Sequence, residues 1–255
     1  MAGHVVTRFE SVYPAVTCVA EDHPVVGRTL DSVSARGKHL LMTFSGGLVL
    51  RTHLRMHGSW HIYPTGARWK RPAGDMRVLV CTAAACAVGF NVPIAELLTT
   101  RELEKHAQLR ALGPDLLKSP DRDEILRRMR AHDGDPIAEV LLNQRVAAGI
   151  GNVFKSEILF VAGVQPFTQT SALSDAQLAR IIDIALEQLA ANVMSSAQTL
   201  SHITGRRTTR SLDPSAKLWV YGRGGKPCRR CGTAIQSRKT GLDARVTYWC
   251  PSCQQ

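Results

Sequence analysis

The 255-residue sequence has no long apolar run, no recognisable signal peptide and no internal repeat. The first two absences argue against a membrane-spanning or secreted protein. The sequence contains neither a basic amphipathic helix nor a lipidation motif, so it does not favour a membrane surface as the partner. We therefore expect a cytoplasmic globular protein with one large or two medium domains and an additional small module.

Acidic residues are scarce in the last quarter of the chain. Residues 201–255 contain eleven lysines and arginines but only two acids, Asp213 and Asp243, so this segment carries +9 of the chain's net charge of +11. A compact and strongly basic element attracts a polyphosphate backbone. The sequence pI of about 9.7 agrees, and we expect nucleic acid to be the partner.

Four of the seven cysteines form two Cys-x-x-Cys pairs separated by 18 residues, namely Cys228, Cys231, Cys250 and Cys253. This spacing is typical of a zinc site in which each pair supplies two thiolates and the intervening segment closes as a β-hairpin. A redox or disulfide role is the alternative. In a reducing compartment such pairs bind metal more often than they form disulfides, so we predict one structural Zn²⁺ ion.

The other three cysteines lie in apolar or strand-like segments of the chain. Cys18 stands in VTCVA, and Cys81 and Cys86 stand in VLVCTAAACAV. Cysteine in such surroundings behaves as a small hydrophobe. We predict that all three are buried and unpaired.

Residues 5–100 are predicted to be rich in strands. The segments Leu40–Phe44 and Leu48–His53 flank Ser45-Gly46-Gly47, which is typical of a hairpin. Further short strands are expected at Val5–Phe9, Ser59–Tyr63, Met76–Cys81 and Ala85–Phe90. Several short strands separated by turn residues favour a sandwich or a barrel.

The hydrophobic period becomes helical in the second half. A charged helix is expected at Thr100–Arg110, followed by helices at Asp121–His132, Ile137–Val146, Val153–Ala162 and Asp175–Val193. Gly149-Ile150-Gly151-Asn152 separates two of them and places Asn152 at a helix N-terminus, where a phosphate could bind. Asn152 could instead be an ordinary N-cap. The polar residues 199–215 are expected to form a connection to the zinc module.

Four segments resemble, in order, motifs of the formamidopyrimidine-DNA glycosylase and endonuclease VIII family. Residues 36–41 (RGKHLL) are similar to its RGKxLL strand, and residues 111–116 (ALGPDL) to its interdomain segment. Residues 148–166 (AGIGNVFKSEILFVAGVQP) resemble its helix–two-turns–helix motif. Residues 219–232 (WVYGRGGKPCRRCG) and 245–254 (RVTYWCPSCQ) resemble its terminal zinc finger. The resemblance implies an α+β multidomain fold: a β-sandwich at 1–118, a helical domain at 119–205, and a linker with a four-cysteine zinc-finger β-hairpin at 206–255.

The resemblance also implies base excision DNA repair, with excision of oxidised bases and β,δ-elimination at the abasic site. The partner would be damaged or abasic DNA, bound by a nucleoid-associated monomer. Lys38 would contact the phosphate at the lesion and assist elimination, while Asn152 and Arg245 would grip the phosphates that flank the extruded nucleotide.

The gap that base extrusion leaves in the stack would be filled from the loop that holds Arg55, Met56 and His57. Met56 could equally be an ordinary core residue. His39 and His53 are expected to be DNA-contacting or structural, because no carboxylate or metal-ligand spacing accompanies them.

A second wedge, an Arg-Arg-Phe run after Asp-Pro, is typical of the formamidopyrimidine branch. This chain has Phe90–Ala95 (FNVPIA) in its place. The difference favours the endonuclease VIII branch and therefore oxidised pyrimidines as substrates.

Family members begin with Pro-Glu-Gly after methionine removal, and the proline amine attacks C1′ of the damaged nucleoside. This chain begins Met1-Ala2-Gly3-His4 and lacks that segment and about four helical turns. We expect a mis-assigned start. The alternatives are a truncated, catalytically inactive lesion- or abasic-DNA-binding protein, a replacement amine on Ala2, or a non-catalytic zinc-ribbon binder of nucleic acid.

Overall fold

The computed structural model describes residues 1–193, 206–209, 211, 213, 215–241 and 244–255. Their contacts divide the chain into two compact units, Met1–Ala111 and Leu112–Gln255. Most of the connection expected at residues 199–215 lies outside the described residues. Among the described helices, none is long and apolar enough to cross a bilayer.

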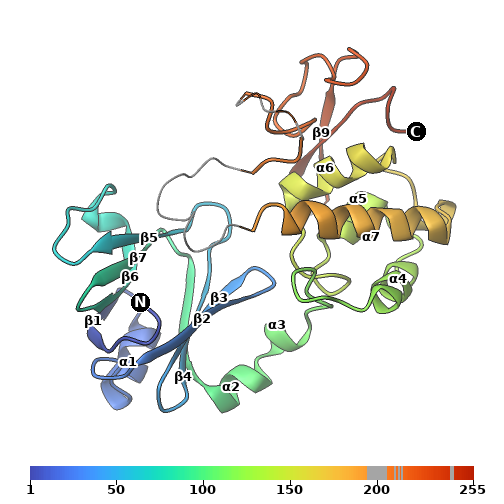
Figure 1. Ribbon diagram of the computed structural model, residues 1–255. Coiled ribbons are helices and arrows are strands. Elements are labelled where there is room, and N and C mark those ends of the chain that lie inside the picture. The colour runs from blue at the N-terminus through green and yellow to red at the C-terminus, as the bar shows by residue number, and fades with distance from the viewer. Residues whose placement is uncertain (194–205, 210, 212, 214, 242–243) are drawn as a thin grey trace. The chain divides into compact units, whose positions relative to one another are not determined.

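The N-terminal unit contains two four-stranded antiparallel sheets (Figure 1). One has the order β1-β6-β7-β5 and the other β2-β3-β4-β8. Their bounds are β1 Val6–Ser11, β2 Leu30–Arg36, β3 His39–Phe44, β4 Leu48–His53, β5 Ser59–Pro64, β6 Met76–Thr82, β7 Ala85–Phe90 and β8 Ile94–Thr99. The strands predicted from alternation are confirmed, and so is the sandwich; β2 and β8 were not predicted.

Residues from both sheets share one apolar core. Phe44 and Leu50 from one sheet and Val78 and Val80 from the other are fully buried in the same cluster. Helix α1 (Pro14–Asp22) adds Val16 to this cluster. No helix was predicted within the strand-rich residues 5–100, so α1 corrects that prediction. Pro14 stands in the first turn of the helix, a position that tolerates its missing N–H.

The helix expected at Thr100–Arg110 is two short helices, α2 (Thr100–Lys105) and α3 (Ala107–Arg110). The backbone is extended at His106, whose Nε2 lies 3.1 Å from a Glu96 carboxylate oxygen. The same carboxylate pairs with the fully buried Arg51 of β4. A tertiary ion-pair network therefore accompanies a break that the charge pattern did not reveal.

Four helices form the core of the C-terminal unit: α4 (Arg122–Arg130), α5 (Ile137–Leu142), α6 (Asn152–Ala162) and α7 (Asp175–Ala190). Two 3-10 turns complete the described helical elements, η1 (Ala73–Asp75) in the first unit and η2 (Thr170–Ala172) in the second. The predicted helical domain is confirmed, but α5 ends at Leu142 instead of Val146.

The early end of α5 has a side-chain cause. The Gln144 amide donates to the carbonyl oxygens of Leu142 and Ile150, at 2.9 and 3.0 Å, and accepts from the Gly149 N–H. Gly113 passes the same turn so closely that a Cβ would lie 2.5 Å from the Val146 carbonyl oxygen. One glutamine thus closes the turns between α5 and α6.

The zinc module contains an antiparallel hairpin of β9 (Gln236–Thr240) and β10 (Arg245–Trp249). Strand β10 packs on α6, and Figure 1 shows the hairpin beside that helix. The predicted hairpin is confirmed.

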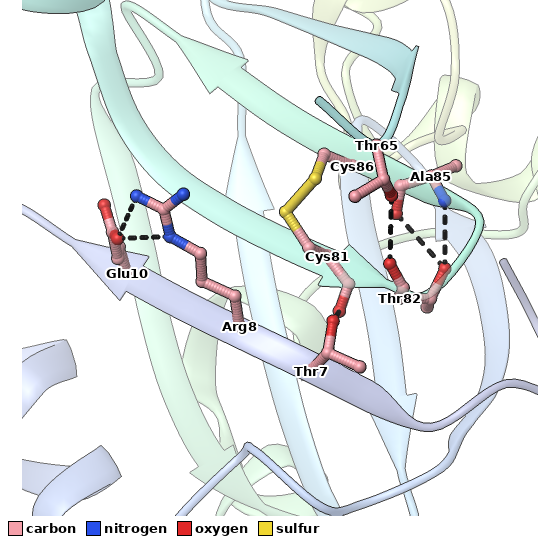
Figure 2. Close-up of a disulfide and its surroundings, with 8 residues drawn as sticks. All are labelled: Thr7, Arg8, Glu10, Thr65, Cys81, Thr82, Ala85 and Cys86. Carbon is pink, nitrogen blue, oxygen red and sulfur yellow. Dashed lines mark hydrogen bonds and ion pairs between the residues drawn. A yellow bond between two sulfur atoms is a disulfide. The ribbon is translucent and has the colours of Figure 1, made fainter. Parts of the chain in front are cut away.

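The prediction for the three remaining cysteines is confirmed in part: Cys81 is buried, but Cys86 is only half-buried, and neither is unpaired. Cys81 and Cys86 face each other across β6 and β7 and form a disulfide (Figure 2), and Cys18 is exposed. Apolar neighbours in the sequence do not reveal which residues face one another across a hairpin, whereas the strand register does. Thr7 donates to the Cys81 carbonyl from the adjacent β1.

Alkylation tests the disulfide directly. Zinc-free, denatured protein should take up five alkyl groups before reduction, because five cysteines are free, and seven after it. Replacing both Cys81 and Cys86 by valine should lower the free energy of unfolding by roughly 2 kcal/mol, as for a short closed loop. Seven alkyl groups on unreduced protein, measured by mass spectrometry, would rule the bond out.

Candidate nucleic-acid interface and zinc site

The four predicted zinc ligands meet in one cluster. The Sγ atoms of Cys228, Cys231, Cys250 and Cys253 all lie within 4.8 Å of one another. The Cys228–Cys253 and Cys231–Cys250 sulfur distances are 4.0 and 3.5 Å. A tetrahedral Zn²⁺ with bonds of about 2.3 Å needs sulfurs about 3.8 Å apart, so the cluster fits a closed structural zinc site.

The four thiols differ in how readily they ionise: hydrogen bonding with Thr233 lowers the pKa of Cys231 to about 6. Burial, followed by hydrogen bonds from neighbouring cysteines, raises the pKa of the Cys253 thiol to about 12. Burial likewise raises the pKa of Cys250. Thiolates are the ligands of Zn²⁺, and only a bound cation would keep all four sulfurs deprotonated near neutrality.

Helix α6 presents a polar face to the zinc-finger hairpin. The Asn152 Nδ2 donates to the Val246 carbonyl at 3.0 Å, and three residues on, the Lys155 Nζ donates to the Thr247 hydroxyl at 2.6 Å. Ser156 Oγ accepts from the Tyr248 N–H at 3.3 Å. Residues three and four apart lie on one side of a helix, so this side of α6 follows β10 along its length.

Asn152 is therefore not the N-cap that its position predicts. Gly151 is the N-cap, with no side-chain cap bond, and Asn152 is the first residue of α6. Its amide reaches across to the strand that begins with Arg245. The structure thus brings the two predicted phosphate-gripping residues to one edge of the C-terminal unit.

Glu157 secures the chain that enters the zinc finger. Its fully buried carboxylate accepts from the backbone N–H groups of Trp219, Val220 and Tyr221, at 2.8, 2.9 and 2.8 Å, and from the Thr208 hydroxyl. A buried carboxylate is stable only when such donors compensate its lost hydration. This single side chain holds three successive peptide groups in place.

Sequence reasoning missed Lys155, Ser156 and Glu157. The signal was available, because they form a polar triplet inside the otherwise apolar helix segment VFKSEILF. All three are completely buried. Buried polar side chains in such a segment need partners from another part of the fold.

Lys38 occupies the turn between β2 and β3, not a strand, and is half-buried. The cross-strand pair His39 and His53 lies beside it, with ring centroids 4.7 Å apart. Burial, followed by the charge of Arg51, lowers the pKa of His39 to about 3. The same two causes lower the pKa of His53, with smaller contributions from Arg55 and Lys38. Both histidines are neutral at pH 7.

The predicted wedge residues Arg55, Met56 and His57 lie on the loop between β4 and β5, and all are exposed. Met56 is 81% exposed and is not a core residue. The loop is tight: the Gly58 N–H donates to the Leu54 carbonyl at 2.9 Å, and a Cβ on Gly58 would lie 2.7 Å from that oxygen.

The loop is tied to the histidine pair, because the Arg55 N–H donates to the His53 Nδ1 at 3.3 Å. His39 and His53 are cross-strand partners, so the β2–β3 turn just before His39 and the wedge loop just after His53 lie at the same end of the sheet.

Three domain families match the chain in order. The formamidopyrimidine-DNA glycosylase N-terminal domain matches residues 1–92, its H2TH domain residues 112–204, and the zinc finger found in FPG and IleRS residues 225–255. A probable endonuclease 8 2 from Streptomyces coelicolor is 39% identical over 259 residues, covering 100% of this chain and 88% of the relative. The chain belongs to the formamidopyrimidine-DNA glycosylase and endonuclease 8 family.

Other members of the family support the same placement. The DNA-(apurinic or apyrimidinic site) lyase Nei2 of Mycolicibacterium smegmatis is 36% identical, over 100% of this chain and 92% of the relative. The structure of Lactococcus lactis formamidopyrimidine-DNA glycosylase bound to DNA containing an abasic site superposes with a TM-score of 0.81. It is 26% identical, over 100% of this chain and 94% of that one. The similarity to endonuclease 8 relatives agrees with the branch that FNVPIA favours.

The zinc finger of this family member makes a specific prediction. Purified protein should contain one zinc per chain, and Cys250→Ser should release it, because three thiolates bind Zn²⁺ far less tightly than four. Loss of the metal should disorder the hairpin and weaken DNA binding. Elemental analysis checks the stoichiometry; metal-free protein purified without chelators would contradict the assignment.

Proposed function

We propose that this protein is a bifunctional DNA glycosylase and abasic-site lyase of base excision repair that acts on oxidised pyrimidines. The observation that carries the proposal is the joining of α6 to β10, in which Asn152 is bonded to the strand that begins with Arg245. Membership of the family and the abasic DNA held by the Lactococcus lactis relative support it. We further propose an intracellular monomer.

The Asn152–Arg245 edge suits a phosphate clamp. An amide NH₂ has two donor hydrogens, and the Val246 carbonyl uses one of them. The other hydrogen and the Arg245 guanidinium can both donate to a phosphate oxygen. A clamp that rests on a helix and a metal-closed hairpin is held rigidly, as the recognition of a distorted backbone requires.

Lys38 and the wedge loop are suited to contacts at the lesion itself. His39 and His53 are neutral, so the positive charge near them comes from lysine and arginine side chains. The buried Arg51 is paired with Glu96, whereas Lys38 and Arg55 lie on the β2–β3 turn and the wedge loop. An ammonium beside the lesion phosphate stabilises the charge that develops as that phosphate leaves during elimination. The exposed thioether of Met56 can fill the space of the extruded base.

Salt-dependent binding tests the phosphate contacts. Lys38→Ala and Arg245→Ala should each reduce the slope of log K against log salt by roughly 0.9, the value for one released counterion contact on duplex DNA. Fluorescence anisotropy with abasic duplex measures the slope. Arg101→Ala and Arg180→Ala, which remove exposed arginines from α2 and α7, are the matched controls and should leave it unchanged. Equal slopes for all four variants would contradict the assignment.

The clamp also predicts that Asn152 contributes more to binding of abasic duplex than of intact duplex. Asn152→Ala should weaken binding to abasic duplex about tenfold and binding to intact duplex less, because the distorted backbone is what the clamp fits. Equal loss on both duplexes would assign Asn152 to hairpin attachment alone.

Borohydride trapping tests the chemistry. An abasic-site lyase of this kind forms a Schiff base between an amine and the abasic sugar, and borohydride reduces it to a stable covalent product. An extended polypeptide that starts Pro-Glu-Gly and carries the family's first helix should form one, because a secondary amine attacks C1′. In that background Lys38→Ala should slow strand cleavage.

One result would overturn this view. An inert extended polypeptide that still binds abasic DNA would favour a non-catalytic lesion binder.

A further inference from the structure

Lys155 is an unusual group to find where α6 meets the zinc-finger hairpin. Its side chain is completely buried, and its hydrogen bond among the described residues goes to the Thr247 hydroxyl, at 2.6 Å. Thr247 in turn shares a 2.9 Å hydrogen bond with the Thr240 hydroxyl on β9. None of the ion pairs between described residues includes Lys155.

Burial and the nearby charge of Arg245 oppose the protonation of Lys155, and Glu139 favours it. Burial, followed by the charge of Arg245 on β10, lowers the pKa of Lys155 to about 8, and Glu139 on α5 raises it. Among the described residues these two are the charged groups that shift its pKa. Glu157, on the same helix, is occupied by the N–H groups of residues 219–221.

A buried lysine of this kind costs stability. The pKa in the folded protein lies below the ordinary value of 10.5. The cost is therefore fully present below about pH 8 and is relieved as the pH rises toward the unfolded value. Thr247 could be held by a neutral side chain at lower cost, so the ammonium itself calls for a ligand.

We propose that Lys155 is a positioning residue of the phosphate clamp: its buried positive charge adds to that of Arg245 and attracts one backbone phosphate of abasic DNA to the edge formed by Asn152 and Arg245. Arg245 and Lys155 carry like charges that oppose each other in the free protein. An anion at the edge that Asn152 and Arg245 form is attracted to both of them, and the low polarity around Lys155 weakens screening of its charge. This inference rests on the proposed function.

Linkage makes the proposal measurable. Since a bound phosphate favours the charged form of Lys155, DNA binding should raise its pKa and take up a proton near pH 8. The affinity of the wild-type protein for abasic duplex should then fall roughly tenfold from about pH 7 to about pH 9.5, the change for a shift of one pKa unit.

Two variants isolate the charge. Lys155→Arg stays protonated over this range and should bind with an affinity that does not change with pH. Lys155→Met keeps the length without the charge, so it should bind about tenfold more weakly at pH 7 and also show no change with pH. Lys118→Met, which removes an exposed lysine, should keep the wild-type profile. Anisotropy titrations of the zinc-loaded protein with a duplex that holds a stable abasic analogue give all four profiles.

A second measurement separates this role from a structural one. Lys155→Met should raise the Tm at pH 7, because it removes a buried charge, while its binding weakens. Combined with Arg245→Ala, it should cost less affinity than it does alone, because the two charges act on one phosphate. Additive losses, or a wild-type pH profile in Lys155→Met, would overturn the inference and leave the proposed function intact. Absence of abasic-DNA binding by the wild-type protein would overturn both.

Discussion

The buried carboxylate of Glu157 is the constraint on which the C-terminal unit depends. An ionised group in the interior is tolerated only when its hydration is replaced, and here three consecutive N–H groups and a hydroxyl replace it. The segment 219–221 leads directly to the first zinc-ligand pair. The contact therefore fixes the entry to the finger, and Lys155, Ser156 and Asn152 on the same helix fix β10.

Zinc and α6 contribute differently to the edge formed by Asn152 and Arg245. Four cysteines within 4.8 Å close the finger on itself, but they do not determine which surface the hairpin presents. The side-chain to backbone bonds from α6 supply that orientation. In the N-terminal unit, two neutral histidines in place of a metal site support the turn of Lys38 and the loop of Met56. In both units, buried polar side chains on helices or strands hold in place the residues that we propose contact DNA.

Much of this was predictable from the sequence because the responsible signals are local. Alternation and the Ser45-Gly46-Gly47 turn predict β3 and β4, and cysteine spacing predicts the zinc cluster. What could not be predicted depends on partners distant in the chain. Gln144 ends α5 early, the strand register pairs Cys81 with Cys86, and Asn152 bonds to a residue 94 positions away.

Hydrogen exchange of the Glu157→Gln variant tests the central claim that α6 holds the finger in its binding position. An amide group in place of the carboxylate removes an acceptor oxygen, so the N–H groups of residues 219–221 should lose protection while the zinc stays bound. Affinity for abasic duplex should fall about tenfold. Glu187→Gln, at an exposed position of α7, should change neither quantity. Lost protection with wild-type affinity, or unchanged protection in Glu157→Gln, would contradict the account.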